Sequence, residues 1–409
     1  MRILFFTENY PPEVNAAASR VHERARLWAR AGHEVTVITC APNFPQGRVH
    51  AGYRNRPRQV ETIEGVRVVR VWSFMARNEG LALRMLDFLS FMVTGFLGGM
   101  AERRPDIVTS TSPQFFAAVA AWACAALRRR PYVFELGDLW PASITALGAM
   151  RRSWAIRRME ALELFLYRRA AAVIALTEDF ERDLVSRGIP AGKIVVVRNG
   201  VDLDRYAPRA RDAALARAHA LEDRFVVAYI GTHGLAHALD KVLDAAALVA
   251  REEPGVRFVF VGDGAAREGL AGEAARRGLG NVAFLGPRPK EEMPRWWSLA
   301  DAGLVSLRDI ALFEGVIPSK VFEAMGMGVP VIFSGPRGEA SAIVEEAGCG
   351  LLVPPETPRA LADAVLALAR DRTLRARLAE AARAAAPRHS RVRQAERVLG
   401  VYRAVLEER

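Results

Sequence analysis

A charged segment in the second half of the chain, residues 314–332, combines residue types that could hold a diphosphate. Glu314 precedes the triplet Pro318-Ser319-Lys320, and Glu323 follows the lysine by three residues. We expect a loop and the first turn of a short helix here, followed by a small-residue turn and an apolar strand. A cationic side chain and free backbone N–H groups at a helix N-terminus suit an anionic diphosphate. A surface helix start with solvated charges is the alternative interpretation of this segment by itself.

Two glycine-containing loops are predicted at strand ends in the same half. Their residues are Gly231, Thr232 and Gly234 in the first loop, and Gly262, Asp263 and Gly264 in the second. Glycines let backbone amides approach a phosphate closely, and Asp263 could also cap the helix that follows it. A tight turn explains either loop alone. Because the carboxyl ends of parallel strands meet at one edge of a sheet, we expect both loops beside segment 314–332.

The order of elements predicts two α/β halves. A strand at 3–6, a helix at 20–31 ended by Gly32 and a strand at 35–39 form a βαβ unit, which implies a parallel sheet. Helices fill most gaps between the later strands, and residues 114–127 are apolar all round, as in a buried helix. The further strands are expected at 66–71, 107–110, 132–136, 173–176, 194–197, 225–230, 257–261, 282–285, 302–305 and 329–333.

The chain of 409 residues is too long for one ordinary core, and its pattern restarts after residues 199–202. We therefore place a first domain at 1–200 and a second at 201–386, with a C-terminal helix at 387–409 that packs back on the first. In open parallel sheets ligands bind at the carboxyl ends of the strands. The cleft between two facing sheets is then the expected site.

Composition limits the partners and cofactors. A formal net charge of +11 suits nucleic acid, an acidic membrane or phosphorylated substrates. The arginine clusters do not alternate with aromatic residues and no nucleic-acid motif is present, so we expect no nucleic-acid partner. Three scattered cysteines and seven scattered histidines lack metal spacing, and no Asp-X-Asp pattern ends a strand, so we predict metal independence. The first strand–turn–helix lacks the glycine triplet of a dinucleotide site.

Residues 81–100 are mostly apolar, which raises the question whether they form a membrane-spanning helix. Arg84 and Asp87 interrupt the run, so it is a poor spanning helix. It fits a core helix, or a helix in the bilayer interface beside arginine clusters such as Arg103-Arg104. The N-terminal apolar run meets Glu8 and is too short for a signal peptide. We therefore expect a cytoplasmic protein, with peripheral contact to the cytoplasmic face of an anionic inner membrane through residues 81–104.

The motifs together resemble the family-four retaining glycosyltransferases, which have the GT-B fold of two Rossmann-like domains facing across a cleft. The resemblance covers nearly the whole chain and includes the string at 323–332 and the opening Pro11-Pro12 loop. Four further strings resemble the bacterial N-acetyl-L-fucosaminyltransferases and other enzymes of polysaccharide, O-antigen and lipopolysaccharide assembly. They lie at 7–13, 41–47, 135–141 and 318–320.

The resemblance implies transfer of a sugar, such as an N-acetylated deoxyhexosamine, from a UDP-linked donor to a lipid-linked or saccharide acceptor. No cofactor is implied besides this nucleotide-sugar substrate, and no protein nucleophile. Glu323 would contact the ribose, and the glycine loops would hold the diphosphate and sugar. The family often places seven residues between two glutamates, whereas eight separate Glu314 from Glu323, so Glu314 would reach the sugar only from a bulged loop. Thr232 stands near a position that is often arginine, so we predict that Lys320 supplies the positive charge.

In the first half, Asp138 is the candidate acid–base or acceptor-orienting group, with helix capping as the alternative. The resemblance implies that acceptors bind on the first loop and near the loop of Asp138. The implied acceptor-binding residues are Glu13, Asn15, Ser19, Arg20 and Trp140.

Two other classes of protein remain as alternatives. One is a different enzyme on the same fold, a phosphorylase or nucleotide-sugar epimerase. A phosphorylase needs a cofactor lysine in a longer chain, and an epimerase needs acid–base residues on both faces of the sugar, where we find one candidate. The other is a non-catalytic nucleotide-binding protein, which the displaced Glu314 would permit.

Overall fold

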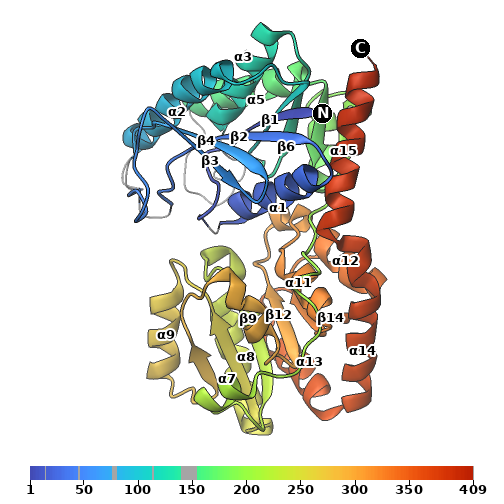
Figure 1. The fold of residues 1–409 in the computed structure, drawn as a ribbon. Helices are drawn as coiled ribbons and strands as arrows, with labels where there is room; N and C mark the ends of the chain where they lie inside the picture. Colours follow the sequence, from blue (N-terminus) through green and yellow to red (C-terminus); the bar gives the residue numbers. More distant parts are fainter. Residues whose placement is uncertain (14, 45–46, 76–80, 113–114, 140–153, 409) are drawn as a thin grey trace. The chain divides into compact units, whose positions relative to one another are not determined.

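The computed structural model describes residues 1–13, 15–44, 47–75, 81–112, 115–139 and 154–408. The chain forms two compact units, shown in Figure 1. The first contains Met1–Arg198 together with Val392–Arg409, and the second contains Asn199–Arg391. Each is an α/β unit with its own sheet and its own buried layers.

The first unit is built on an eight-stranded sheet of order β3-β4-β2-β1-β5-β6-β7-β8. All pairings are parallel except that of β3 with β4, a hairpin closed by Glu64 and Gly65 at positive φ. Strand β3 was not predicted from the sequence. The strands are β1 (Arg2–Phe6), β2 (Glu34–Cys40), β3 (Arg58–Ile63), β4 (Val66–Val71), β5 (Ile107–Thr111), β6 (Tyr132–Leu136), β7 (Ala172–Ala175) and β8 (Ile194–Val196).

Helices cover both faces of this sheet (Figure 1). Alternate residues of β1 point to opposite faces of the sheet. Ile3 and Phe5 face α1 and α15, whereas Leu4 and Phe6 face α2 and α3. Helix α3 is largely buried, which confirms the expectation for residues 114–127. The helices are α1 (Ala16–Arg30), α2 (Leu81–Ala101), α3 (Phe115–Arg128), α5 (Trp154–Arg169), α6 (Glu178–Ser186), η1 (Ala191–Lys193) and α15 (Arg391–Glu407).

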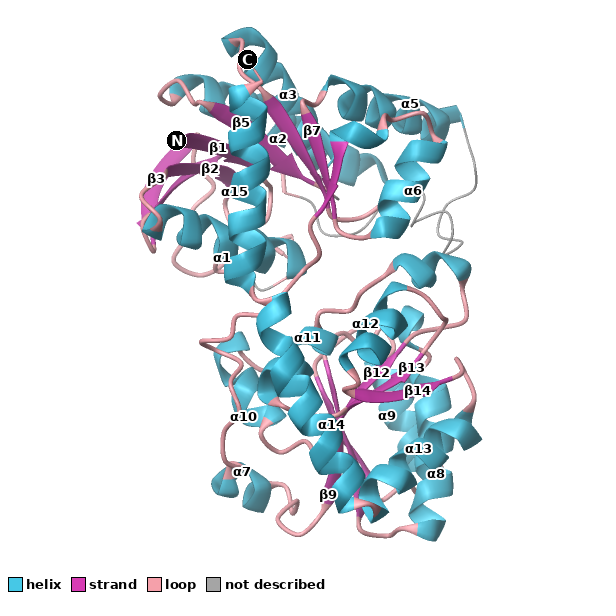
Figure 2. Ribbon diagram, turned by 90° about the vertical axis from the view of Figure 1, so that its right-hand side faces the viewer, coloured by secondary structure: helices cyan, strands magenta, loops and turns pink. Residues whose placement is uncertain are grey.

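Helix α15 completes the first unit from the far end of the chain, and Figure 2 shows it beside the sheet. The indole Nε1 of Trp28 donates to the Ala395 carbonyl at 3.0 Å, and the Trp28 and Tyr402 rings lie 5.5 Å apart. The Tyr402 hydroxyl donates to Glu135 Oε1 at 2.8 Å, and the other oxygen of Glu135 is paired with Arg24. This buried network joins α1, β6 and α15.

We predict that Glu135→Leu destabilises the protein by about 3–5 kcal/mol, because it leaves the Arg24 guanidinium buried without its carboxylate. The two side chains are only 1% and 4% exposed, so water cannot replace the lost partner. The double variant Arg24→Met/Glu135→Leu should recover most of this loss. Urea unfolding of the full chain measures both, and equal losses in the single and double variants would contradict the reasoning.

The second unit contains a parallel six-stranded sheet of order β11-β10-β9-β12-β13-β14. Strand β9 comes first in the chain but lies inside the sheet, between β10 and β12. The connections therefore leave β9 and β12 in opposite directions, and in open α/β sheets ligands bind at the carboxyl ends of the strands at such a switch point. The strands are β9 (Phe225–Ile230), β10 (Val256–Val261), β11 (Val282–Phe284), β12 (Ala302–Ser306), β13 (Val331–Ser334) and β14 (Gly350–Val353).

Two buried layers flank this sheet. Helices α8, α9 and α13 pack on one face, and α10, α11, α12 and α14 pack on the other. The helices are α7 (Ala213–Ala218), η2 (Leu235–His237), α8 (Leu239–Glu252), α9 (Arg267–Arg276), η3 (Lys290–Glu292), α10 (Met293–Trp297), η4 (Ala311–Gly315), α11 (Lys320–Met327), α12 (Glu339–Ala347), α13 (Pro358–Arg370), α14 (Arg372–Ala385) and η5 (Ala386–His389).

Candidate functional site

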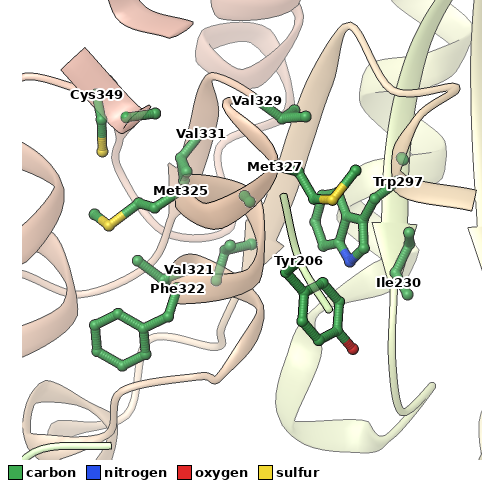
Figure 3. Close-up of a cluster of buried hydrophobic side chains, with 14 of the residues drawn as sticks. Tyr206, Ile230, Trp297, Val321, Phe322, Met325, Met327, Val329, Val331 and Cys349 are labelled. Atoms are coloured by element: carbon green, nitrogen blue, oxygen red, sulfur yellow. The ribbon is translucent and has the colours of Figure 1, made fainter. Parts of the chain in front are cut away.

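Helix α11 starts at Lys320, directly after β12 and its loop, and is fixed by its apolar face. Val321, Phe322, Met325 and Met327 are buried in one cluster, which Figure 3 shows. The helix ends at Gly328, whose φ of 69° suits glycine. This packing places the predicted lysine and glutamate of the segment at the carboxyl end of β12, beside the point where the strand order of the sheet reverses.

Lys320 is a buried cation without a hydrogen-bond acceptor. The residue is 7% exposed, and its Nζ has no acceptor among the described residues. Nζ lies 3.5 Å from the ring centroid of Tyr229, a cation–π contact that replaces part of the lost hydration. A Cβ at Gly231 would come within 3.2 Å of Nζ, so glycine keeps the space beside the ammonium open. An anion placed beside Nζ would offset the cost of burying this charge.

The protonated and neutral forms of Lys320 are both populated near neutral pH. Burial lowers the pKa of Lys320 to about 7, and the carboxylate of Glu323 opposes that shift. Burial and the nearby Lys320 ammonium lower the pKa of His233 and of His237 to about 4. Both imidazoles are therefore neutral at pH 7, and Lys320 is the group in this cluster that titrates near neutrality.

The two glycine loops interlock at the ends of β9 and β10. The Gly231 amide donates to Val261 O at 2.9 Å, and the His233 amide donates to Asp263 O at 2.8 Å. A Cβ on Gly262 would lie 2.0 Å from Gly231 O, and one on Gly264 would lie 2.5 Å from His233 O. Loop-to-loop packing therefore explains Gly262 and Gly264, whereas Gly231 faces the lysine. Of the other predicted donor residues in these loops, Thr232 and Asp263 are exposed and Gly234 is half-buried.

Glu323 is half-buried on the first turn of α11 and is oriented by an indole that was not foreseen from the sequence. The Nε1 of Trp297 donates to Glu323 Oε2 at 3.2 Å, and the Ser319 hydroxyl lies 3.4 Å from Oε1. Trp297 is fully buried and packs on Gly303, where a Cβ would lie 2.9 Å from its ring. The sequence signal for this role is a Trp-Trp pair on the short helix before β12.

Glu314 lies in the 3₁₀ turn η4, between β12 and α11. Its side chain is exposed, and its backbone packs against Gly338, where a Cβ would lie 2.1 Å from Glu314 O. Gly338 precedes α12, so the structure places Glu314 at the carboxyl end of β13. Pro318 is half-buried and Ser319 exposed immediately before α11.

In the first unit, Arg20 and the backbone of Asp138 meet at the carboxyl ends of β5 and β6. Nη2 of Arg20 donates to Thr111 Oγ1 at 2.8 Å and to Ser112 O at 3.3 Å. Ser112 Oγ accepts the amides of Gly137 and Asp138 at 2.7 and 3.1 Å. Arg20 is buried, and its hydrogen bonds hold the end of β5 in place. Asp138 is half-buried.

Two other predicted residues of the first unit, Glu13 and Asn15, have structural partners. Glu13 is buried and accepts the amides of Asn43 and Phe44 at 2.8 and 2.9 Å, which fastens the loop after β1 to the loop after β2. Asn15 caps α1 by accepting the Ala18 amide at 2.9 Å. Ser19 is half-buried within α1. Trp140 lies outside the described residues.

Comparisons with known proteins agree with this architecture. A model of the glycosyl transferase 4-like domain matches residues 15–200, and a model of glycosyl transferases group 1 matches residues 224–371. The chain is 26% identical over 372 residues to an Escherichia coli K12 glycosyl transferase named for colanic acid biosynthesis, WcaI, covering 88% of this chain and 90% of that protein. It is 28% identical over 409 residues to a GDP-mannose-dependent alpha-mannosyltransferase of Mycobacterium tuberculosis, covering 99% and 97%.

Solved structures share the fold at low sequence identity. HepE of Anabaena, solved with UDP and glucose, aligns with a TM-score of 0.72 at 20% identity and covers 98% of this chain and 99% of its own. Sucrose-phosphate synthase of Thermosynechococcus elongatus aligns with a TM-score of 0.76 at 19% identity over 100% of both chains. The two α/β units thus have the GT-B fold, as expected.

Proposed function

Because the chain is a glycosyltransferase with domains of the group 1 kind, we propose that it moves a sugar from a UDP-linked donor to an acceptor, with retention of anomeric configuration. The second unit, 201–386 in our sequence-based division, binds the donor. The first unit, with the C-terminal helix, binds the acceptor. The acceptor is a lipid-linked or other saccharide used in cell-surface polysaccharide synthesis.

The observation that carries this proposal is the buried ammonium of Lys320, which lies beside Gly231 with no acceptor in the described chain. A nucleoside diphosphate supplies the missing anion. When the bond between the anomeric carbon and the phosphate oxygen breaks, negative charge grows on the diphosphate and positive charge on the sugar ring. A fixed cation in a low-dielectric site stabilises that phosphate oxygen more than water does.

The neighbouring donor residues have complementary roles in this proposal. Glu323, held by the Trp297 indole, binds the ribose hydroxyls of the nucleotide. The N-terminus of α11, with Pro318 and Ser319 before it, faces the phosphates with its N–H groups. Exposed Thr232 and Asp263 lie on the loops that flank the sugar. Glu314 contacts the sugar from the turn η4.

On the acceptor side, the central residue of the proposal is Asp138, which follows β6. Asp138 orients the acceptor hydroxyl, and the departing phosphate oxygen takes the proton that this hydroxyl loses on attack. Arg20 and Glu13 are buried and hydrogen-bonded within the unit, so they contribute to acceptor binding by fixing the positions of the neighbouring loops. Asn15, Ser19 and Trp140 complete the proposed acceptor-binding set. No group of three or more metal-binding side chains occurs among the described residues, and the proposed reaction uses none.

Two further points define the biological setting. The relative WcaI is named for the synthesis of colanic acid, which supports a role in surface polysaccharide assembly. The strings that resemble the N-acetyl-L-fucosaminyltransferases lead us to propose an N-acetylated deoxyhexosamine as the transferred sugar. Such an enzyme would work in the cytoplasm, at the inner face of the membrane that carries its acceptor.

The test is a thermal-shift screen of the full chain against UDP-, GDP- and ADP-sugars, followed by a transfer assay with the labelled sugar that binds. We expect UDP-sugars to raise the melting temperature most. Transfer should fall sharply in both Lys320→Ala and Glu323→Ala. Undiminished transfer by both variants would contradict the assignment of the donor site. A rise in melting temperature with GDP-sugars alone would contradict the prediction that the donor carries UDP.

A further inference from the structure

Helix α2 exposes an apolar stripe where a soluble helix normally carries polar side chains. Between residues 83 and 97, every described position that is exposed on this helix is leucine or valine. These positions recur every three or four residues and so lie along one side of the helix. The members of the stripe, with their exposed fractions, are Leu83 (48%), Leu86 (47%), Leu89 (37%), Val93 (53%) and Leu97 (58%).

The stripe is not needed for the core, because another face of α2 already packs there. Phe91 is fully buried. A Cβ on Gly98 would lie 2.7 Å from Val71, and one on Gly99 would lie 2.4 Å from Phe6, so the helix sits close to the sheet on that side. Helix α3 runs beside it in Figure 1. The expectation of a core helix is therefore right for one face of α2 and wrong for the other.

Arginines gather where the stripe ends. Arg103 and Arg104 are exposed directly after α2, and Arg104 donates to Arg128 O at 3.3 Å, which places the end of α3 alongside. The acidic Glu102 is already neutralised, since it accepts from Arg58 at 2.6 Å and from Arg67 at 2.9 Å. The end of the stripe thus carries an excess of positive charge.

We propose that α2 docks on the surface of a membrane that contains anionic phospholipid. The stripe, roughly 20 Å long, would lie flat at the boundary between headgroups and acyl chains, with the arginines on the headgroups. No helix in the described part of the chain is long and apolar enough to cross a membrane, so the contact is peripheral. The exposed arginines at the end of the stripe complement anionic headgroups, which favours a membrane over a second copy of this chain, and light scattering tests the second copy below.

This inference does not depend on the donor site, but it fits a lipid-linked acceptor, since docking would bring the acceptor-binding unit to the membrane surface. The two proposals fail separately. A wild-type protein that shows a UDP-induced thermal shift but binds anionic vesicles no better than the stripe variant would overturn the membrane proposal alone. A wild-type protein that binds the vesicles through the stripe but shows no UDP-induced thermal shift would overturn the donor-site proposal alone.

The experiment is co-sedimentation of the full chain with vesicles of phosphatidylcholine and phosphatidylglycerol at 7:3, and with pure phosphatidylcholine. The stripe variant is Leu86→Gln/Leu89→Gln/Val93→Gln/Leu97→Gln. The matched control is Val185→Gln/Val392→Gln, which alters two apolar side chains of the same unit that are 43% and 49% exposed. Light scattering reports the oligomeric state of each protein.

We expect the wild type and the control to bind the anionic vesicles, at least about tenfold more tightly than the neutral ones, and to be released by high salt. The stripe variant should bind at least roughly 30-fold more weakly, because four apolar side chains no longer enter the interface. Equal binding by the stripe variant and the wild type would overturn the proposal. A wild-type dimer that the stripe variant converts to a monomer, with no vesicle binding by either, would assign the stripe to a second copy instead.

Discussion

Lys320→Met should reduce the rate of sugar transfer by about 10³-fold or more and at the same time make the protein more stable. The loss of rate follows because one fixed positive group facing a developing anion contributes on the order of 10²–10³ in kcat, and its loss also weakens donor binding. The gain in stability follows because methionine fills the same buried space without a charge. Steady-state transfer kinetics and urea unfolding measure the two effects.

The sign of the stability change is set by the pKa of Lys320. The ordinary pKa of 10.5 applies in the unfolded chain, and burial lowers it to about 7 in the folded protein. Between these values the unfolded state holds a proton that the folded state lacks, so wild-type stability rises with pH from about 7 to 10.5. At or below pH 7, Lys320→Met should therefore gain stability on the order of 5 kcal/mol, because the pKa is lowered from 10.5 to about 7 and each pKa unit corresponds to about 1.4 kcal/mol.

The matched control is Lys241→Met, which removes an exposed lysine of the same unit that pairs only loosely with Asp240 and Asp244. This variant should keep the transfer rate, and its stability should change by less than about 0.5 kcal/mol. Equal effects of the two lysine substitutions on transfer would show that general positive charge, rather than the buried ammonium, matters for the reaction.

Glu323→Ala should lower kcat/KM for the donor by about 10²–10³-fold, because it removes the carboxylate that we assign to the ribose and leaves the Trp297 indole without its acceptor. Trp297→Phe keeps the carboxylate but not its orienting hydrogen bond, so we expect a smaller loss of about tenfold. Donor titrations of both variants measure the two effects. Similar losses in the two variants would mean that Glu323 only supports the packing around Trp297.

Removing the carboxylate of Glu323 should also shift the pH dependence of UDP binding. Its carboxylate raises the pKa of Lys320 against the effect of burial, so the pKa should fall further in Glu323→Ala. The pH at which UDP binding weakens should then move to a lower value than in the wild type. The comparison variant Glu314→Gln leaves this pH profile unchanged. If Glu314 reaches the sugar, that variant lowers kcat without changing the affinity for UDP.

Strands β9 and β10 were predictable because they are apolar runs that are followed directly by glycine. Strand β9, for example, was expected at 225–230, and the structure has it at Phe225–Ile230. Strands β3 and β14 were missed for different reasons. Residues 58–63 alternate between exposed and half-buried and carry charges at an edge, whereas 350–353 is a four-residue strand that begins with glycine.

The sequence could not show that Lys320 is buried. Lys320 follows Pro-Ser at a helix start, where a lysine is normally solvated, and only the fold places its ammonium over the ring of Tyr229. The hydrogen bond from Trp297 to Glu323 joins residues 26 positions apart, so no local pattern could indicate it. For α2, the sequence left a core helix and a helix in the bilayer interface as alternatives, and only the structure shows that one face packs in the core while the other is exposed.

The central claim is that a nucleoside diphosphate supplies the anion that Lys320 lacks, and proton uptake on binding tests it most directly. Calorimetry of UDP binding to the full chain at pH 8, in buffers of different ionisation enthalpy, gives the number of protons taken up. We predict uptake of the larger part of one proton per UDP, since a lysine with a pKa of about 7 is mostly neutral at that pH and becomes charged against the phosphates. Uptake should vanish in Lys320→Met, whose affinity for UDP should be far lower. Wild-type binding without proton uptake, at an affinity that Lys320→Met retains, would contradict the account.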